Sequence, residues 1–438
     1  MNQKNKKPFA TLFWNKQFNE NIPPAALQLE ACYGDDFSIK EPGRNYNEYP
    51  RLLHGDNLQV MKALQPAYRE SIDLIYCDPP FLTNKAYSAR VGRNEDSRKP
   101  DEWDLARGYQ DTWKDGAEYL DMLYTRLLEM YSLLSPEGTL YLHLDWHASS
   151  YARVMLDEIF GLDRLLNEIV WVYHGPSPIK SAFNRKHDTI LVYTKTDDYI
   201  FNVDDVRVPY NPSTIKTFAS SKKAGFGKKP NLKRGKVPED WWYFPVVARL
   251  HNERTGYPTQ KPLALLNRIV KASSNPDSIV ADFFCGSGTT AEAAEQNGRR
   301  WIACDNTQLA VSTTYKRMLE CKASPFTVWS TDTRKSQSSA LSPTIKINLE
   351  DTCVQLSIHT PEQTDQYIQL VEVDWDYNGS VFHSKEQIST VENSDHSKTD
   401  SYTLTHTYQE ERDFQIAVRF FDNQGRITTL MESLNTGK

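Results

Sequence analysis

The sequence lacks several features that would narrow its class at once. No apolar run reaches the length of about 18 residues that a membrane-spanning helix requires. Residues 1–7 are basic and polar and lack the apolar core of a secretory signal. The six cysteines are scattered and form no C-x-x-C pair, which favours reduced thiols over a disulfide framework or a zinc site. We therefore expect a cytoplasmic protein with no membrane partner.

A strong charge of one sign is also absent, because the 438 residues carry a net charge of −6. That value averages two unlike parts. Residues 336–438 contain 7 basic and 16 acidic residues, a net charge of −9, which leaves 44 basic and 41 acidic residues in 1–335. Within the latter, residues 207–238 hold nine basic residues and no acidic one. The overall charge therefore does not exclude a partner as acidic as a nucleic acid.

Strands and helices alternate from about residue 50, a pattern typical of an α/β domain. The mostly apolar run Ile72–Cys77, followed by Asp78-Pro79-Pro80, predicts a buried strand that ends at proline. Residues 82–116 lack clear periodicity and are expected to form a long loop. Further strands are expected at 139–144, 168–172, 189–193, 279–284 and 301–304, and further helices at 120–134, 152–160, 262–272 and from about 290.

Composition divides the chain into four expected parts. Residues 1–49 would be a loose arm, and 50–325 the α/β domain with a basic insertion at about 195–255. Residues 326–343 have the composition of a linker, and 344–438 alternate with a period of two, which predicts an acidic, all-β domain. Motifs within 373–379 and 406–425 loosely resemble those of Ig-like sandwich domains, which implies a packing or interaction module.

A glycine-rich turn gives the strongest local signal. The segment Asp282-Phe-Phe-Cys-Gly286-Ser-Gly288-Thr289-Thr predicts a strand, a tight turn and a helix start, an arrangement that can close over a nucleotide-like ligand. It has no Gly-Lys-Ser/Thr of a P-loop and lacks the third glycine of a dinucleotide fingerprint. By itself such a turn is often structural. Asp305 follows the next strand, where a carboxylate can bind ribose hydroxyls, so together they favour an adenosine-containing cofactor.

The second signal is Asp78-Pro79-Pro80-Phe81. A bare D-P-P is usually a turn that ends a strand. Here a carboxylate and the Pro79 carbonyl are two acceptors that can hold both protons of an exocyclic amino group, and Phe81 can stack on the ring that carries it. Such an amine is a poor nucleophile, and two acceptors favour the pyramidal nitrogen that can attack an electrophilic methyl group.

These motifs, in this order, resemble the permuted (beta-class) amino-methyltransferases of DNA, the N-4/N-6 DNA methylases, in particular type III-like modification subunits. Phe284–Thr289 is similar to the family's F-x-G-x-G-T motif. Thr259-Gln260-Lys261-Pro262 is similar to a segment that borders the methionine end of the cofactor, and Gly55-Asp56 to one that faces the cofactor adenine. Residues 119–145 and 187–193 also resemble family segments, so the likeness covers roughly 50–320.

The resemblance implies a Rossmann-like α/β fold with a mixed seven-stranded sheet and S-adenosylmethionine as cofactor. The implied catalytic residues are Asp78, Pro79, Pro80 and Phe81. The implied cofactor-binding residues are Asp56, Lys261, Asp282, Phe284, Gly286, Gly288, Thr289 and Asp305. Members with Asp first in the catalytic motif usually methylate adenine, whereas Phe in its last position replaces the commoner Tyr and loses a hydroxyl.

The basic segment 207–238 lies where this class carries its target-recognition region. A charge run is usually a solvated face, but this one abuts Trp241-Trp242-Tyr243-Phe244, and phosphate neutralisation beside an aromatic surface suits duplex DNA. The residues expected to contact DNA are Lys222, Lys223, Lys228, Lys229, Lys233, Arg234 and Lys236. His143, Asp145 and His147 form an H-x-D-x-H cluster that we interpret as structural, because methyl transfer needs no metal.

The sequence therefore predicts a site-specific DNA methyltransferase that acts on a flipped adenine. A cytosine amino group, RNA and a protein glutamine amide remain alternative substrates, although the glutamine-modifying relatives carry N-P-P-Y after the cofactor motif. A non-catalytic DNA-binding protein on the same fold is the alternative of another class. Membership of a restriction-modification system, a cognate restriction endonuclease and a homodimer are left open.

Overall fold

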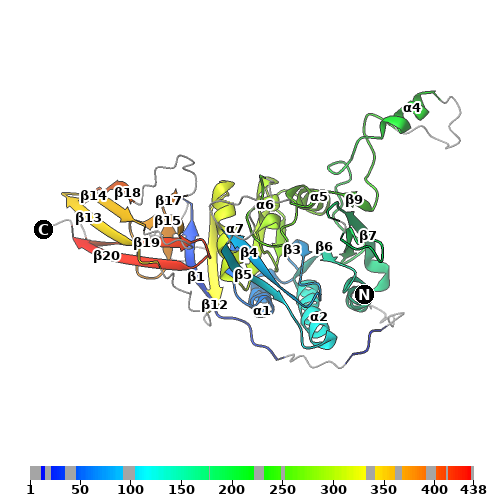
Figure 1. The fold of residues 1–438 in the computed structure, drawn as a ribbon, viewed down its shortest axis with the longest axis horizontal. Coiled ribbons are helices and arrows are strands. Elements are labelled where there is room, and N and C mark those ends of the chain that lie inside the picture. Colours follow the sequence, from blue (N-terminus) through cyan, green and yellow to red (C-terminus); the bar gives the residue numbers. More distant parts are fainter. Residues whose placement is uncertain are drawn as a thin grey trace.

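The computed structural model describes residues 11–14, 21–34, 46–91, 104–176, 178–220, 231–247, 252–331, 341–360, 367–390, 401–410 and 413–435. A large mixed sheet lies at the centre, with helices on its two faces and an all-β region at one end (Figure 1). None of the helices in these ranges is long and apolar enough to cross a membrane.

Among the described residues the central sheet has eleven strands, four more than the seven predicted. In spatial order they are β16 (Phe382–Ser384), β1 (Leu27–Tyr33), β12 (Phe326–Thr331), β2 (Arg51–His54), β11 (Arg300–Asp305), β10 (Ile279–Asp282), β3 (Ile72–Cys77), β6 (Leu134–Leu144), β8 (His187–Thr194), β7 (Leu165–Val172) and β9 (Trp241–Tyr243). The strands from β2 to β6 in this order are parallel, whereas β8 runs antiparallel to β6 and β7. The seven strands from β2 to β7 form the middle of the sheet, and β12, β1, β16 and β9 extend its edges.

Two sets of helices cover the sheet because its strands are apolar on both faces. Residues 74 and 76 of β3 pack into one hydrophobic cluster, and residues 75 and 77 into the other. The first cluster contains side chains of α5 (Leu263–Ser273), α6 (Thr289–Gln296) and α7 (Gln308–Glu320). The second contains side chains of α1 (Asn57–Tyr68), α2 (Gly116–Leu133) and α3 (Ser149–Phe160). This is an α/β fold with helix, sheet and helix layers. The remaining helices are short: η1 (Tyr46–Glu48), η3 (Leu162–Arg164) and α4 (Pro212–Ser220), which projects from the body (Figure 1).

Three predicted segments differ from the structure. Residues 82–116 do not form a loop throughout, because β4 (Lys85–Val91) and β5 (Asp104–Asp111) pair as an antiparallel hairpin. The expected arm 1–49 contributes β1, which lies between β12 and β16. The expected linker 326–343 begins with β12, which is parallel to β2 inside the sheet. Each error concerns a strand whose partner lies far away along the chain or whose side chains do not alternate clearly.

The C-terminal region consists of strands in its described parts. One sheet contains β13 (Thr344–Glu350), β14 (Cys353–His359) and β18 (Ser401–Thr407), and the other contains β17 (Glu386–Ser389), β15 (Ile368–Asp374), β19 (Asp413–Asp422) and β20 (Ile427–Asn435). Both sheets are antiparallel and contribute to one hydrophobic cluster. Strand β16 belongs to this region in sequence, but it pairs with β1 and so joins the region to the central sheet.

Candidate active site

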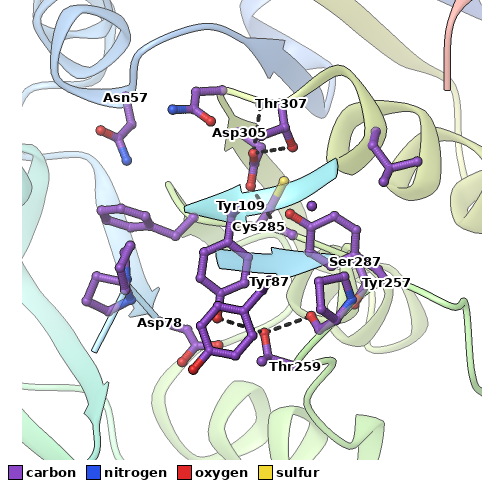
Figure 2. Close-up of a pocket in the computed structure, with 18 of the residues that line it drawn as sticks. Asn57, Asp78, Tyr87, Tyr109, Tyr257, Thr259, Cys285, Ser287, Asp305 and Thr307 are labelled. Atoms are coloured by element: carbon purple, nitrogen blue, oxygen red, sulfur yellow. Dashed lines mark hydrogen bonds between the residues drawn. The ribbon is translucent and has the colours of Figure 1, made fainter. Parts of the chain in front are cut away.

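A pocket of about 980 Å³ opens where the parallel strands β2, β3, β10 and β11 reach their carboxyl ends, and Figure 2 shows part of its lining. This edge of an open α/β sheet is the usual place for a ligand. The predicted site residues that line the pocket are Asp56, Asp78, Pro79, Pro80, Phe81, Lys261, Asp282, Phe284, Gly286, Thr289 and Asp305. Gly288 is not among the lining residues, and its contact with the cofactor stays a prediction.

The two glycines of the turn after β10 have different tasks. Gly286 has a φ of 50°, and its backbone N–H donates to Asp305 Oδ2 at 3.1 Å. Gly288 has a φ of 76° and ends the turn at the start of α6. A Cβ at Gly288 would lie 2.7 Å from the Thr314 side chain on α7. Gly286 therefore shapes the pocket wall, whereas Gly288 allows α6 and α7 to approach each other.

The Asp305 carboxylate is already oriented by the protein. Besides Gly286 N–H, it accepts hydrogen bonds from the Thr307 backbone N–H at 2.9 Å and the Thr307 hydroxyl at 3.0 Å. Burial raises the pKa of Asp305, and these donors oppose the shift. Figure 2 shows Asp305 and Thr307 together on one side of the pocket, with Asp78 on another side. The acid after β11 is thus fixed at the pocket wall, as the sequence pattern predicts.

Asp78 has one oxygen engaged and one without a partner. Lys261 Nζ donates to Asp78 Oδ2, and the ammonium lies 5.3 Å from the centre of the Phe81 ring. Asp78 Oδ1 is buried and has no hydrogen-bond partner among the described residues. Leaving a carboxylate oxygen buried and unsatisfied is costly, which marks it as a position for a ligand donor. The sequence analysis assigned Lys261 to the cofactor. In the structure its ammonium group donates a hydrogen bond to the Asp78 carboxylate.

The rest of the Asp78–Phe81 motif is held from several sides. Tyr119 Oη donates to the Pro80 carbonyl at 2.9 Å, whereas none of the described residues donates to the Pro79 carbonyl. Phe81 stacks on His143, with ring centres 5.9 Å apart and planes at 23°. One face of Phe81 is therefore packed, and the ring remains part of the pocket lining.

Asp111, at the end of β5, anchors the segment that follows the motif. Its carboxylate accepts hydrogen bonds from the backbone N–H groups of Phe81, Leu82 and Thr83 at 2.8 to 3.2 Å, and from the Trp113 indole at 2.7 Å. Leu82 has a φ of 64°, an unusual conformation for a leucine. Asp111 is 1% exposed, so these bonds replace its contact with water. Sequence reasoning missed it because Asp111 lies in the segment expected to be a loop.

The hairpin β4–β5 adds two aromatic side chains to the pocket. Tyr87 and Tyr109 stack with centres 4.8 Å apart and planes at 14°, and both line the pocket next to Thr259 and Asp78 (Figure 2). Burial raises the pKa of Tyr109 well above its usual range, so its phenol stays neutral. Each strand contributes one tyrosine, and no periodic pattern in the sequence predicts this wall.

The H-x-D-x-H residues bind protein groups. His143 Nδ1 lies 2.7 Å from Tyr76 Oη, and its Nε2 lies 3.2 Å from Asp188. His147 Nδ1 pairs instead with Asp145 at 2.8 Å. In the described ranges no group of three potential ligands could hold a metal ion. His143 supports the ring of Phe81 from behind.

The basic segment is described only in part. Lys222, Lys223, Lys228 and Lys229 lie outside the described residues. Arg234 donates to both oxygens of Asp204, at 3.1 and 2.7 Å, and Arg207 donates to the same carboxylate at 2.6 Å. Lys236 pairs with Glu239, while Lys233 is exposed. The segment contains no acid, but acids just outside it neutralise three of its basic side chains.

Comparison with known proteins gives consistent results. A family model described as "DNA methylase" matches residues 72–316. The chain is 32% identical over 269 residues to the DNA adenine methyltransferase YhdJ of Escherichia coli K12, across 60% of this chain and 81% of that protein. It is 30% identical over 247 residues to the type II methyltransferase M.HpaI of Haemophilus parainfluenzae, across 56% of this chain and 68% of that protein. It is similar at 20% identity to the solved M1.HpyAVI–SAM complex, with 61% of this chain and 98% of that chain covered and a TM-score of 0.39.

Proposed function

The chain belongs to the DNA methylase family, and we propose that it transfers a methyl group from S-adenosylmethionine to the exocyclic amino group of adenine in duplex DNA. The observation that carries this proposal is the buried Asp78 Oδ1, which has no partner among the described residues and lies in the same pocket as the glycine turn and Asp305. An acceptor without a donor is what an amino-group substrate requires.

The pocket residues fit S-adenosylmethionine. Asp305, fixed beside the Gly286 turn, would accept hydrogen bonds from the ribose hydroxyls, and Phe284 and Thr289 would line the same wall. Five carboxyl groups line the pocket, those of Asp56, Asp78, Asp111, Asp282 and Asp305, against three cations, Arg126, Lys261 and Arg426. This excess of acidic groups suits a sulfonium ion. When bound, the cofactor supplies an electrophilic methyl group.

The catalytic role belongs to the Asp78–Phe81 motif. Lys261 holds Asp78 Oδ2, which leaves Oδ1 to accept one amino proton, and the Pro79 carbonyl would accept the other. Phe81, packed against His143, would stack on the base. The stacking would fix the position of the amino nitrogen relative to Asp78 and the Pro79 carbonyl. Positioning and electrostatic stabilisation would then account for most of the rate enhancement.

A base inside a duplex cannot reach a pocket at the edge of the sheet, so we expect the target adenine to be flipped out. The basic segment around α4 is our candidate for the DNA-binding lobe, through Lys222, Lys223, Lys228, Lys229, Lys233, Arg234 and Lys236. Its support is the exposed pair of rings on the edge strand β9, where Trp241 and Tyr243 are 61% and 52% exposed. Large exposed aromatic surface marks an interaction site.

The finer assignments follow from the same features. We place the chain in the permuted beta class, because β3 and its catalytic motif precede the glycine turn after β10 in the sequence. We propose an Ig-like sandwich for the C-terminal region, supported by its two antiparallel sheets with a shared core. A cognate restriction endonuclease and a homodimer complete the proposed partners, and the cytoplasm is the proposed location.

One experiment tests the proposal as a whole. The chain is expressed in a host that lacks DNA methylation, and the host DNA is sequenced for modified bases. We expect N6-methyladenine at one short recognition sequence. If N4-methylcytosine were found instead, the substrate would be cytosine and not adenine. DNA without modified bases would contradict the assignment as a DNA methyltransferase.

Asp78→Asn tests the catalytic motif. The variant replaces an acceptor oxygen at the amino group, and we expect methylation to fall by at least about 100-fold, the usual effect of removing one group that stabilises the transition state. Binding of S-adenosylhomocysteine, followed by calorimetry, should change little. Asp197→Asn is the matched control, because it also removes a carboxylate from an ion pair, with Arg164, at an exposed site. Full activity of Asp78→Asn would contradict the assignment.

A further inference from the structure

The turn between β19 and β20 reaches the methyltransferase pocket from the C-terminal region. Gln424 and Arg426 line the pocket together with the segment from Asp305 to Leu309. Both residues lie beyond 72–316, the part that the DNA methylase family model matches. The pocket is thus completed by residues that the family likeness does not cover.

The turn is seated directly on the start of α7. A Cβ added at Gly425 would lie 3.0 Å from Leu309 Cα, 3.3 Å from the Gln308 carbonyl and 2.4 Å from Ser312 Oγ. Gly425 also has a φ of 79°. Helix α7 begins at Gln308, directly after Thr307, the residue that orients Asp305. Thr307 also caps the helix by accepting a hydrogen bond from Ala310 N–H at 3.2 Å. Only glycine allows this approach without displacing the backbone of either element.

Arg426 has a donor that nothing in the described part of the chain uses. Its Nε donates to Asp422 Oδ2 at 2.9 Å, and the Asp422 Oδ1 atom accepts the backbone N–H groups of Gln424 and Arg426, each at 2.9 Å. Arg426 Nη2 is buried without a hydrogen-bond partner. The pair with Asp422 neutralises the guanidinium, so the side chain offers a donor without adding net positive charge beside a cationic cofactor.

We propose that Arg426, with Gln424, binds the nucleoside part of S-adenosylmethionine, so that the C-terminal β region forms a wall of the cofactor site. Adenine ring nitrogens and ribose oxygens are acceptors for the Arg426 donor, and the Gln424 amide offers both a donor and an acceptor. The place of these residues next to Asp305 and Thr307 assigns them to the nucleoside rather than to the amino-acid end. This inference rests on the proposed cofactor site and extends it to a region without family likeness.

Arg426→Lys tests the donor while keeping the ion pair with Asp422. Calorimetry on the full chain should give dissociation constants for S-adenosylhomocysteine and for 5′-methylthioadenosine, which lacks the amino-acid end. We expect both to weaken by the same factor, about 3- to 10-fold, which is typical for one lost hydrogen bond. Unchanged constants for both would overturn the proposal. A loss for S-adenosylhomocysteine alone would overturn the nucleoside assignment.

Gly425→Ala tests the seating of the turn, and Gly379→Ala is its matched control. Both glycines have positive φ, at 79° and 84°, but a Cβ at Gly379 meets nothing within 4 Å. We expect Gly425→Ala to weaken S-adenosylhomocysteine binding by more than Gly379→Ala, with thermal unfolding measured for both. Equal effects would contradict a role of the turn. If the parent chain bound neither ligand, the proposed cofactor site itself would fail, which separates the two outcomes.

Discussion

At the scale of single residues, Asp282 links the pocket to pH. It lies at the end of β10, accepts hydrogen bonds from Phe284 N–H at 3.0 Å and Thr290 Oγ1 at 2.6 Å, and is 4% exposed. Burial, opposed by these two donors, raises its pKa to about 7. The folded state therefore keeps a proton that the unfolded state loses near pH 4. Stability from this group is complete below pH 4 and is lost as pH rises to about 7.

The variant Asp282→Asn should remove this dependence, since an amide keeps an acceptor for Phe284 N–H and does not titrate. Urea unfolding of both proteins at pH 5 and pH 8 measures the difference. Relative to the variant, the parent should lose stability between the two pH values, with an upper limit of about 4 kcal/mol over the full range from pH 4 to pH 7. Parallel pH profiles would show that Asp282 is ionised throughout.

Asp204 sets how many cations of the basic segment are available for the proposed contacts with DNA. Arg207 and Arg234 both bind its exposed carboxylate, and together they lower the pKa of Asp204 to about 2. Asp204→Asn should release both guanidinium groups, tighten duplex binding at low salt and steepen the dependence of log K on log salt, by about 0.9 for each added phosphate contact. Fluorescence anisotropy between 50 and 200 mM salt measures both quantities. Unchanged affinity and salt dependence in the variant would place these arginines away from the DNA.

At the scale of elements, the hairpin β4–β5 holds residues 81–83, at the end of the proposed catalytic motif, through Asp111. Asp111→Ala should release three backbone N–H groups, including that of Leu82 in its unusual conformation, and so lower the single-turnover methylation rate. We expect a loss of about 10- to 100-fold, because small displacements of a reacting group cost that much. Binding of S-adenosylhomocysteine should be retained.

Asp115→Ala is the matched control for this change. Asp115 also accepts a backbone N–H, that of Glu118 at 2.9 Å, but it caps α2 and does not bind residues 81–83. It should cost about 1 kcal/mol of stability without slowing methyl transfer. If the two variants had equal rates, Asp111 would have only a structural role.

The elements also show what the sequence could and could not predict. Ile72–Cys77 is predicted as a strand and forms β3, because an apolar run that ends at proline has few other structures available. The helices α2 and α5 follow equally clear spacing. Strand β1 was missed because its neighbours, β12 and β16, lie about 300 residues or more away, and local patterns carry no information on such pairing.

In the site, too, contacts between residues close in sequence could be predicted, whereas contacts between distant residues could not. The glycine turn and Asp305 are close in sequence and lie together in the pocket. The ion pair between Lys261 and Asp78 joins residues 183 positions apart. The sequence could therefore assign each side chain to a motif, but it could not predict that the two side chains pair. Arg426 belongs to a region whose acidity and β pattern gave no reason to expect it at a cofactor pocket.

At the scale of the whole molecule, the C-terminal region shares its core with the central sheet. Phe421 of β19 stacks on Tyr315 of α7, with ring centres 5.6 Å apart and planes at 6°, and Tyr315 Oη donates to the buried Glu372 of β15. Phe421 and Phe382 belong to the same hydrophobic cluster as α5, α6 and α7. The two regions should therefore unfold together.

Phe421→Ala tests this shared core. The change leaves a cavity between the two regions and should destabilise the protein by about 3 to 5 kcal/mol. Urea unfolding, followed by circular dichroism and by tryptophan fluorescence, should give coincident transitions in the parent. Met431→Ala, at a side chain that is 52% exposed on β20, should cost little. Two separate transitions in the parent would contradict a common folding unit.

The position of β1 has a consequence for synthesis on the ribosome. Its antiparallel neighbour β12 ends at residue 331, and its parallel neighbour β16 ends at residue 384. Residues 27–33 therefore leave the exit tunnel long before either partner strand has been synthesised. They have both neighbours only after some 350 further residues have been added. At translation rates of roughly 5 to 20 residues per second, the delay is tens of seconds. During that interval the nascent chain carries an unpaired strand that a chaperone could shield.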